Sequence, residues 1–317
     1  MKKVLVTTRL LKSNEEKISK LWNVKLNLNN EIYSAKQLIE LSKDCDGILS
    51  SILDKIDEKI INKLSDKVKI ISNFAVGFGN IDIEAARKRN IVVTNTPDVL
   101  TDATAEIAML LILGASRRAT EGIKWARNSN WKWSADFLIG KQLSGSRLGI
   151  LGMGRIGRAV AKRAKSFGME IHYHNRSKLE PNLEEGAIYH DSIKSLFSIS
   201  EILSINCPAT DKTKNIINKE TLKFFSEDSI IINSARGDMI EDEAMIEALK
   251  NKKIYALGLD VYKGEPNINT GYLNLPNVFV LPHIGSATKK TRTDMANLAI
   301  DNIEEFFSTG KCRNKVN

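Results

Sequence analysis

Cysteine is scarce in this chain and long apolar runs are missing, and each shortage excludes a class of protein. The three cysteines among 317 residues are too few and too scattered for a disulfide framework or a metal site. We therefore expect a reducing compartment, the cytoplasm, and no bound metal. The longest apolar run, 107–113, is far shorter than the roughly 20 residues that cross a bilayer. The basic and apolar start of the chain is interrupted by polar residues at 7–9, which favours a first strand over a targeting segment.

Basic residues outnumber acidic ones, but their arrangement argues against a nucleic-acid partner. The formal net charge is +9, from 47 lysines and arginines against 38 aspartates and glutamates. No run of five or more basic residues occurs, and the lysines lie beside acidic residues along the predicted helices. We interpret the excess as a solvated surface that mildly favours anionic ligands, and we expect neither nucleic acid nor a membrane among the partners.

The segment 147–175 has the order strand, glycine turn, helix, strand that binds dinucleotides. An apolar strand at 148–151 leads into GMGRIG at 152–157, apolar residues then recur at helical spacing, and a second strand follows at 169–173. Gly152 permits the tight turn, Gly154 lets the backbone approach a pyrophosphate, and Gly157 lets the helix pack close to the sheet. The helix N-terminus offers free N–H groups to the phosphates. The alternative is a glycine-rich turn in another kind of α/β protein.

The end of the second strand indicates which dinucleotide binds. A carboxylate at this place normally accepts hydrogen bonds from the ribose of NAD. Here the strand ends at Asn175, Arg176 and Ser177, with no acidic residue before Glu180. A guanidinium grips a 2′-phosphate with its planar fork, and a hydroxyl donates to it. We therefore predict that NADPH is preferred and that NAD is a possible second cofactor; the alternative is that these are solvated loop charges.

Three residues downstream of this segment supply the chemistry for reducing a 2-keto acid. Arg236 follows the predicted strand 229–233, so it projects from the carboxyl edge of a parallel sheet, where open α/β folds bind their ligands. A guanidinium there pairs with a substrate carboxylate and polarises the adjacent carbonyl. His283 is the predicted general acid for reduction, and Glu265 is expected to hold its tautomer and favour the protonated ring. Each residue alone has an ordinary structural explanation, and only the set predicts a catalytic site.

A second anchor for an anion is predicted upstream, in the loop 73–79 after the strand 69–72. The loop contains two glycines, and Asp82 is placed to cap the helix that runs on to Lys88. Successive N–H groups in such a loop form an anion-binding concavity. A plain turn from strand to helix is the alternative.

The chain resembles the D-isomer-specific 2-hydroxyacid dehydrogenases, and within them the glyoxylate/hydroxypyruvate reductases. The resemblance covers nearly the full length and is carried by several long segments in the family's order: NFAVGFGNID at 73–82, TPDVLTDATAEIAMLLIL at 97–113, LGMGRIG at 151–157, INSARGDMI at 232–240, GLDVYKGEP at 258–266 and LPHIGSAT at 281–288. It implies the catalytic roles given above for Arg236, Glu265 and His283, and NAD(P)H-dependent reduction of glyoxylate or hydroxypyruvate to glycolate or D-glycerate.

The same resemblance implies the binding residues. Substrate contacts are expected at Leu53, at the backbone amides of Val76 and Gly77, and at Arg236. Cofactor contacts are expected at Thr104, Gly152, Gly154, Arg155, Ile156, Gly157, Asn175, Arg176, Ser177, Cys207, Pro208, Ser234, Ala235, Asp260, His283 and Gly285.

The order of predicted elements indicates an α/β protein with two doubly wound parallel sheets. We expect a Rossmann dinucleotide-binding domain, 99–285, inserted into a smaller flavodoxin-like substrate domain made of 1–98 and 286–317. The resemblance places the substrate in the cleft between them. Residues 117–145 are predicted to be irregular, and three tryptophans with Phe137 make them a candidate dimerisation arm, as in related enzymes. Packing of these aromatics within one chain is the alternative to a homodimer.

Two other functions remain open from the sequence. One is a D-lactate-type dehydrogenase for a bulkier 2-keto acid, because the sequence does not fix the size of the pocket. The other is a dinucleotide-sensing binding protein without turnover, although no interaction tail or charged docking strip is evident.

Overall fold

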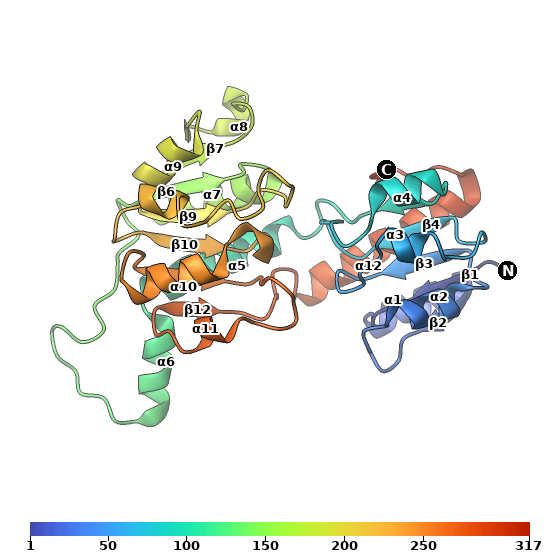
Figure 1. Cartoon of the computed structure of the whole chain (residues 1–317), viewed down its shortest axis with the longest axis horizontal. Coiled ribbons are helices and arrows are strands. Elements are labelled where there is room, and N and C mark those ends of the chain that lie inside the picture. Colours follow the sequence, from blue (N-terminus) through green and yellow to red (C-terminus); the bar gives the residue numbers. More distant parts are fainter. The chain divides into compact units, whose positions relative to one another are not determined.

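The computed structural model describes all residues, 1–317, and they form two compact units (Figure 1). We call Met1–Leu100 with Ser286–Asn317 the flanking unit, and Thr101–Gly285 the central unit. Each unit is built on a wholly parallel sheet, five-stranded in the flanking unit and seven-stranded in the central one, which confirms the predicted α/β fold class. None of the helices is both long enough and apolar enough to span a membrane.

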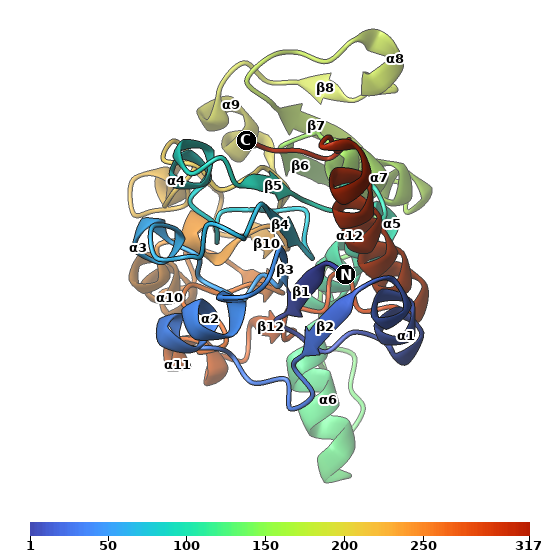
Figure 2. The same cartoon turned by 90° about the vertical axis from the view of Figure 1, so that its right-hand side faces the viewer.

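The sheet of the flanking unit has the strand order β2-β1-β3-β4-β5, the flavodoxin-like arrangement. Its strands are β1 (Lys3–Val6), β2 (Asn23–Leu26), β3 (Gly47–Ser50), β4 (Ile70–Asn73) and β5 (Val92–Thr94). Its helices are α1 (Lys12–Leu21), α2 (Ala35–Ser42), α3 (Glu58–Ile61), α4 (Ile83–Lys88) and α12 (Lys289–Thr309). Figure 2 shows α1 and α12 on one side of this sheet and α2, α3 and α4 on the other. Helices on both faces explain why β3 and β4 are buried along their whole length.

The central unit has the strand order β12-β11-β10-β9-β6-β7-β8, so the direction of winding reverses between β6 and β9. Its strands are β6 (Arg147–Leu151), β7 (Glu170–His174), β8 (Ile188–Tyr189), β9 (Ile202–Ile205), β10 (Ile230–Asn233), β11 (Ala256–Leu259) and β12 (Val278–Val280). Its helices are α5 (Thr101–Ser116), α6 (Ala119–Asn128), α7 (Arg155–Ser166), α8 (Pro181–Glu184), α9 (Ile193–Ile199), α10 (Asp242–Lys250) and α11 (Thr270–Leu273), with short 3-10 turns η1 (Thr221–Phe224) and η2 (Gly237–Met239). Ligands of open α/β sheets bind at such a reversal, beyond the carboxyl ends of the strands.

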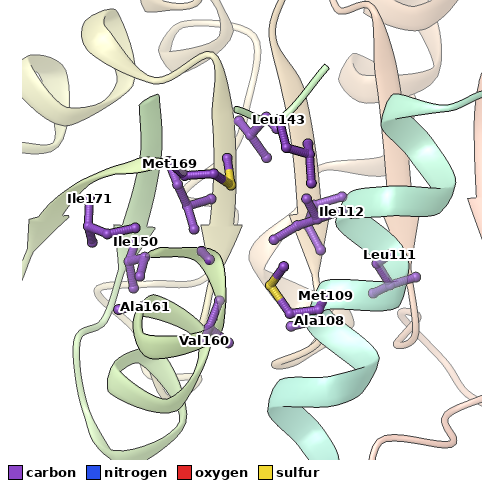
Figure 3. Packing of buried hydrophobic residues seen from close by; sticks show 14 of the residues in the cluster. Ala108, Met109, Leu111, Ile112, Leu143, Ile150, Val160, Ala161, Met169 and Ile171 are labelled. Atoms are coloured by element: carbon purple, nitrogen blue, oxygen red, sulfur yellow. The ribbon is translucent and has the colours of Figure 1, made fainter. Parts of the chain in front are cut away.

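Two apolar cores cover the two faces of this sheet. On one face, side chains of α5 and α7 meet those of β6 and β7, and Figure 3 shows Met109, Val160 and Ile150 among them. On the other face, α9 and α10 contribute Leu196, Phe197 and Met245 to a second core. The continuous apolar strands predicted from the sequence are therefore buried on both sides, as parallel strands are.

One prediction about local structure needs correction. Residues 117–145 are not irregular throughout, because 119–128 form α6, which projects with the following loop away from the sheet of its own unit (Figure 1). By contrast, Asp82 caps α4 as expected, accepting a hydrogen bond from the N–H of Ala85 at 2.9 Å.

Candidate active site

Glu265 and His283 meet in the central unit, beyond the ends of β11 and β12. Nδ1 of His283 lies 2.5 Å from Oε2 of Glu265, and the second carboxylate oxygen accepts the N–H of Tyr262 at 2.7 Å. With a carboxylate as its partner, Nδ1 carries the proton, and Nε2 is the nitrogen left for exchange with a substrate. The arrangement is that of an oriented acid–base pair.

The charge state of Glu265 follows from its neighbours. Burial acts to raise the pKa of Glu265, but the hydrogen bond and charge of His283 lower it, as do the N–H of Tyr262 and the charge of Arg236. The net result is a pKa below the usual value, so Glu265 is a carboxylate at neutral pH.

Arg236 belongs to the same site and is held by its own loop. The side-chain amide of Asn233, the last residue of β10, donates to the carbonyl of Arg236 at 2.8 Å and accepts the N–H of Ala235 at 3.0 Å. Gly237 permits this loop to lie against the next one, because a Cβ there would come within 2.0 Å of the Tyr262 carbonyl carbon. Burial lowers the pKa of Arg236 while the charge of Glu265 raises it, so the guanidinium sits in a poorly solvated place near a carboxylate. Asn233 had not been predicted as a site residue, since its partners cannot be read from its own position.

The loop that carries His283 is fixed by Asp260. Its two carboxylate oxygens accept the N–H groups of Ile284 and Gly285, both at 2.8 Å, and Asp260 is almost wholly buried. Thr104 on α5 donates to the carbonyl of Gly285 at 3.2 Å. His283 itself adopts a left-handed backbone conformation, with φ 54°, which residues with a Cβ avoid. Asp260 and Thr104, predicted as cofactor contacts, thus also position the loop of the histidine.

The glycine turn has the geometry that a dinucleotide requires. Gly152 has φ 96°, and a Cβ there would lie 2.5 Å from the N of Cys207. A Cβ at Gly157 would lie 2.4 Å from the carbonyl of Gly152, whereas one at Gly154 would meet nothing within 4 Å. The turn is therefore tightly packed at Gly152 and Gly157 and open at Gly154, where a pyrophosphate would approach.

Two buried polar atoms at the carboxyl ends of neighbouring strands make no hydrogen bond within the protein. They are Oδ1 of Asn206, after β9, and Oγ of Ser234, after β10. Buried polar atoms are nearly always paired, so these two fit the edge of a ligand with hydrogen-bonding groups. Cys207 lies between the turn and Met239, and burial raises the pKa of its thiol to about 11, so its role is packing.

The remaining predicted positions lie in both units. Oδ1 of Asn175 accepts the N–H of Met153 at 2.7 Å and so ties the second strand to the glycine turn. Arg176 and Ser177 are exposed, and their side chains make no hydrogen bond or ion pair. Other predicted cofactor positions of the central unit are found on the turn, on the first turn of α7 and on the loops after β9 and β10: Arg155, Ile156, Pro208 and Ala235. The predicted substrate residues Leu53, Val76 and Gly77 belong to the flanking unit, where Leu53 is 44% exposed.

Comparison with known proteins agrees with this arrangement. Residues 109–285 match the family model "D-isomer specific 2-hydroxyacid dehydrogenase, NAD binding domain". The chain is 40% identical to glycerate dehydrogenase of Hyphomicrobium methylovorum, over 96% of each protein, and 40% identical to glyoxylate reductase of Thermococcus litoralis, over 96% of this chain and 93% of that protein.

Solved structures give the same result. The NADPH-dependent glyoxylate/hydroxypyruvate reductase of Sinorhizobium meliloti, in complex with NADP and malonate, superposes with a TM-score of 0.89 at 32% identity, over 99% of this chain and 96% of that one. The chain belongs to the D-isomer-specific 2-hydroxyacid dehydrogenase family and is an NAD(P)-dependent oxidoreductase of that family.

Proposed function

We propose that this enzyme reduces glyoxylate and hydroxypyruvate, to glycolate and D-glycerate, with NADPH as the preferred donor. The observation that carries the proposal is the 2.5 Å pair of His283 and Glu265 beside the poorly solvated Arg236, in the unit that bears the dinucleotide turn. The glyoxylate reductases and the glycerate dehydrogenase among its relatives support the substrate class.

Each residue of the site has a task in this reaction. Bound NADPH supplies the hydride to the keto carbon. Arg236 pairs with the substrate carboxylate and polarises the neighbouring carbonyl. Nε2 of His283 donates the proton that converts the carbonyl oxygen into a hydroxyl. Glu265 keeps the proton on Nδ1 and stabilises the charged ring before transfer.

A panel of substrates tests the proposal. Steady-state rates are measured for glyoxylate, hydroxypyruvate, pyruvate and bulkier 2-keto acids with each nicotinamide cofactor. We expect the highest kcat/KM for glyoxylate and hydroxypyruvate. A clear preference for pyruvate or the bulkier acids would indicate a D-lactate-type enzyme instead. Tight NADPH binding without turnover would indicate a sensor.

The preference for NADPH is supported by what surrounds the end of β7. No carboxylate occupies this place, and the side chains of Arg176 and Ser177 are exposed and unpaired, hence available to a 2′-phosphate. Asn175→Asp combined with Arg176→Ala tests the assignment. Aspartate keeps an oxygen to accept the N–H of Met153, so the turn is preserved while the 2′-phosphate is repelled. The idea is wrong if the ratio of NADPH to NADH activity stays unchanged.

We further propose a homodimer formed through 117–145. Helix α6 buries none of its residues, and Trp125, Trp131 and Trp133 are 42%, 51% and 79% exposed. Phe137 packs against Trp125 and Trp131, so part of the aromatic surface is covered within the chain and part is not. Exposed aromatic surface of this kind usually marks an interface. Light scattering that gives the mass of a single chain would remove the proposal.

A cytoplasmic location is also proposed, because all three cysteines are free thiols. Cell fractionation tests it.

A further inference from the structure

Three consecutive carbonyl groups of the loop 74–80 are held by hydrogen bonds from outside the loop or from its base. The carbonyl of Ala75 accepts the N–H of Thr96 at 3.0 Å. The carbonyl of Val76 accepts the side-chain amide of Asn95 at 2.8 Å, and that of Gly77 accepts the side-chain amide of Asn73 at 2.9 Å. The orientation of three successive peptide planes is thereby set.

Fixing the carbonyls also fixes the N–H groups. In a trans peptide the C=O and the N–H of the same plane point in opposite directions. The N–H groups of Val76, Gly77 and Phe78 therefore point away from Thr96, Asn95 and Asn73. None of the three N–H groups donates to an acceptor within the protein, and all three residues are at least partly exposed to solvent. Successive N–H groups that no acceptor in the protein uses are the donors of which an anion site is made.

The base of the loop is braced by a buried polar network. The amide nitrogen of Asn80 donates to the carbonyls of Ser51 and Asp54, both at 3.0 Å, and its oxygen accepts from Asn73 at 3.1 Å. Ser50 donates to the amide oxygen of Asn73 at 3.0 Å. The network joins the loop 74–80 to the loop 51–54, which carries Leu53, so the two predicted substrate loops of the flanking unit behave as one body.

Asp54 anchors the far side of this network. Its Oδ2 accepts from the N–H of Ser51 at 2.6 Å and from the hydroxyl of Thr7 at 2.5 Å. Only 4% of Asp54 is exposed. Buried polar groups that are all satisfied make a rigid unit, because any movement leaves a partner unpaired. The orientation of the loop is therefore determined before a substrate arrives.

We propose that Asn95 and Asn73 are positioning residues that aim the N–H groups of Val76, Gly77 and Phe78 at the carboxylate of the substrate. The proposal rests on the proposed function, which makes the substrate a 2-keto acid, and on the substrate contacts predicted at Val76 and Gly77. Asn95 is the better residue to test, because it is half-buried and its side chain makes only one hydrogen bond, whereas Asn73 is fully buried with several partners.

Two variants of Asn95 separate orientation from packing. Asn95→Ala removes the donor to the Val76 carbonyl. Asn95→Asp keeps the shape but places an acceptor where a donor is needed. Asn277→Ala is the matched control, because the amide of Asn277 also donates to backbone carbonyls, those of Tyr255 at 3.1 Å and Leu249 at 3.4 Å, at the amino end of β12.

Anion binding is measured without turnover, by calorimetric titration of oxalate into the protein saturated with NADP. Binding of NADP, thermal unfolding, and kcat and KM for glyoxylate are measured on the same samples. We expect Asn95→Ala to weaken oxalate about tenfold and Asn95→Asp to weaken it further. NADP binding and kcat should change less than threefold, and Asn277→Ala should bind oxalate like the wild type.

The outcomes separate this inference from the proposed function. Unchanged oxalate affinity in folded Asn95 variants, or no oxalate binding by the wild type, would overturn the inference. Loss of oxalate binding in the variants supports the inference even if the wild type reduces no 2-keto acid. Absence of keto-acid reduction by the wild type would remove the proposed function alone. If Asn95→Ala does not fold, Asn95→Asp and Asn95→Ser decide, and wild-type oxalate affinity in both would overturn the inference.

Discussion

The hydrogen bond between Glu265 and His283 gives the sharpest prediction, for the variant Glu265→Gln. Glutamine keeps the size of the side chain but removes the negative charge that faces Nδ1 at 2.5 Å. Water screens the pair little, since the exposed side-chain fractions are 18% for Glu265 and 29% for His283. A hydrogen bond to a charged group contributes about 1.5–3 kcal/mol, and about 1.4 kcal/mol corresponds to a factor of ten in rate. We expect Glu265→Gln to lower kcat/KM for keto-acid reduction about ten- to a hundredfold at neutral pH.

The assay is kcat/KM for glyoxylate with saturating NADPH, between about pH 4 and pH 9. The difference from the wild type should narrow as the pH falls toward the lowered pKa of Glu265, because the wild type then loses the same negative charge. Glu265→Asp, which keeps the charge, should retain most of the activity. Glu201→Gln is the control for loss of a carboxylate elsewhere. Glu201 lies away from the site and pairs with Arg147, at a distance of 3.1 Å. An equal loss at every pH would refute the electrostatic reasoning.

Three further predictions concern the central unit. Glu265→Gln should also lower the free energy of unfolding at neutral pH. Because folding lowers the pKa of Glu265, the difference in stability between variant and wild type should close as the pH falls through the folded-state pKa. Denaturant titrations from neutral pH to about pH 3 measure this difference. Arg236→Lys should raise KM for glyoxylate about thirtyfold, because a point charge replaces a planar fork, and a normal KM in steady-state assays would remove the assigned role. Gly152→Ala should abolish NADPH binding and lower Tm, because the new methyl group would lie 2.5 Å from the N of Cys207 at a φ of 96°; fluorescence titration and calorimetry measure both.

The sequence predicted the strands and the dinucleotide turn well, because those signals are local. The apolar runs at 148–151 and 229–233 agree with β6 and β10 to within one residue. The same local reasoning failed at 119–128, where α6 forms although it buries none of its residues. Its apolar residues Ala119, Ile123 and Ala126 do recur at helical spacing, a signal that the prediction of an irregular segment overlooked.

The candidate site was predicted as a set of residue types, and the structure adds how they are held. That Arg236, Glu265 and His283 share one unit follows from their order after the glycine turn. The support given by Asn233 and the bond from Asn95 to Val76 depends on side-chain amides whose partners are fixed only by the complete fold. Asparagine in a loop indicates a bond to nearby backbone without saying which carbonyl it reaches.

Asp260 is buried where a charged carboxylate is unfavourable, and the strained backbone of His283 gives the reason for its position. Burial raises the pKa of Asp260 although two N–H groups and the charge of His283 lower it, so keeping a carboxyl there is costly. A left-handed conformation at His283 costs a further 1–2 kcal/mol, roughly. The two hydrogen bonds at 2.8 Å from Ile284 and Gly285 offset the backbone cost, since each bond to a charged acceptor contributes about 1.5–3 kcal/mol. The imidazole is thus held at Nδ1 by Glu265 and along its backbone by Asp260 before any substrate binds, and a preset orientation is the condition for efficient general acid catalysis.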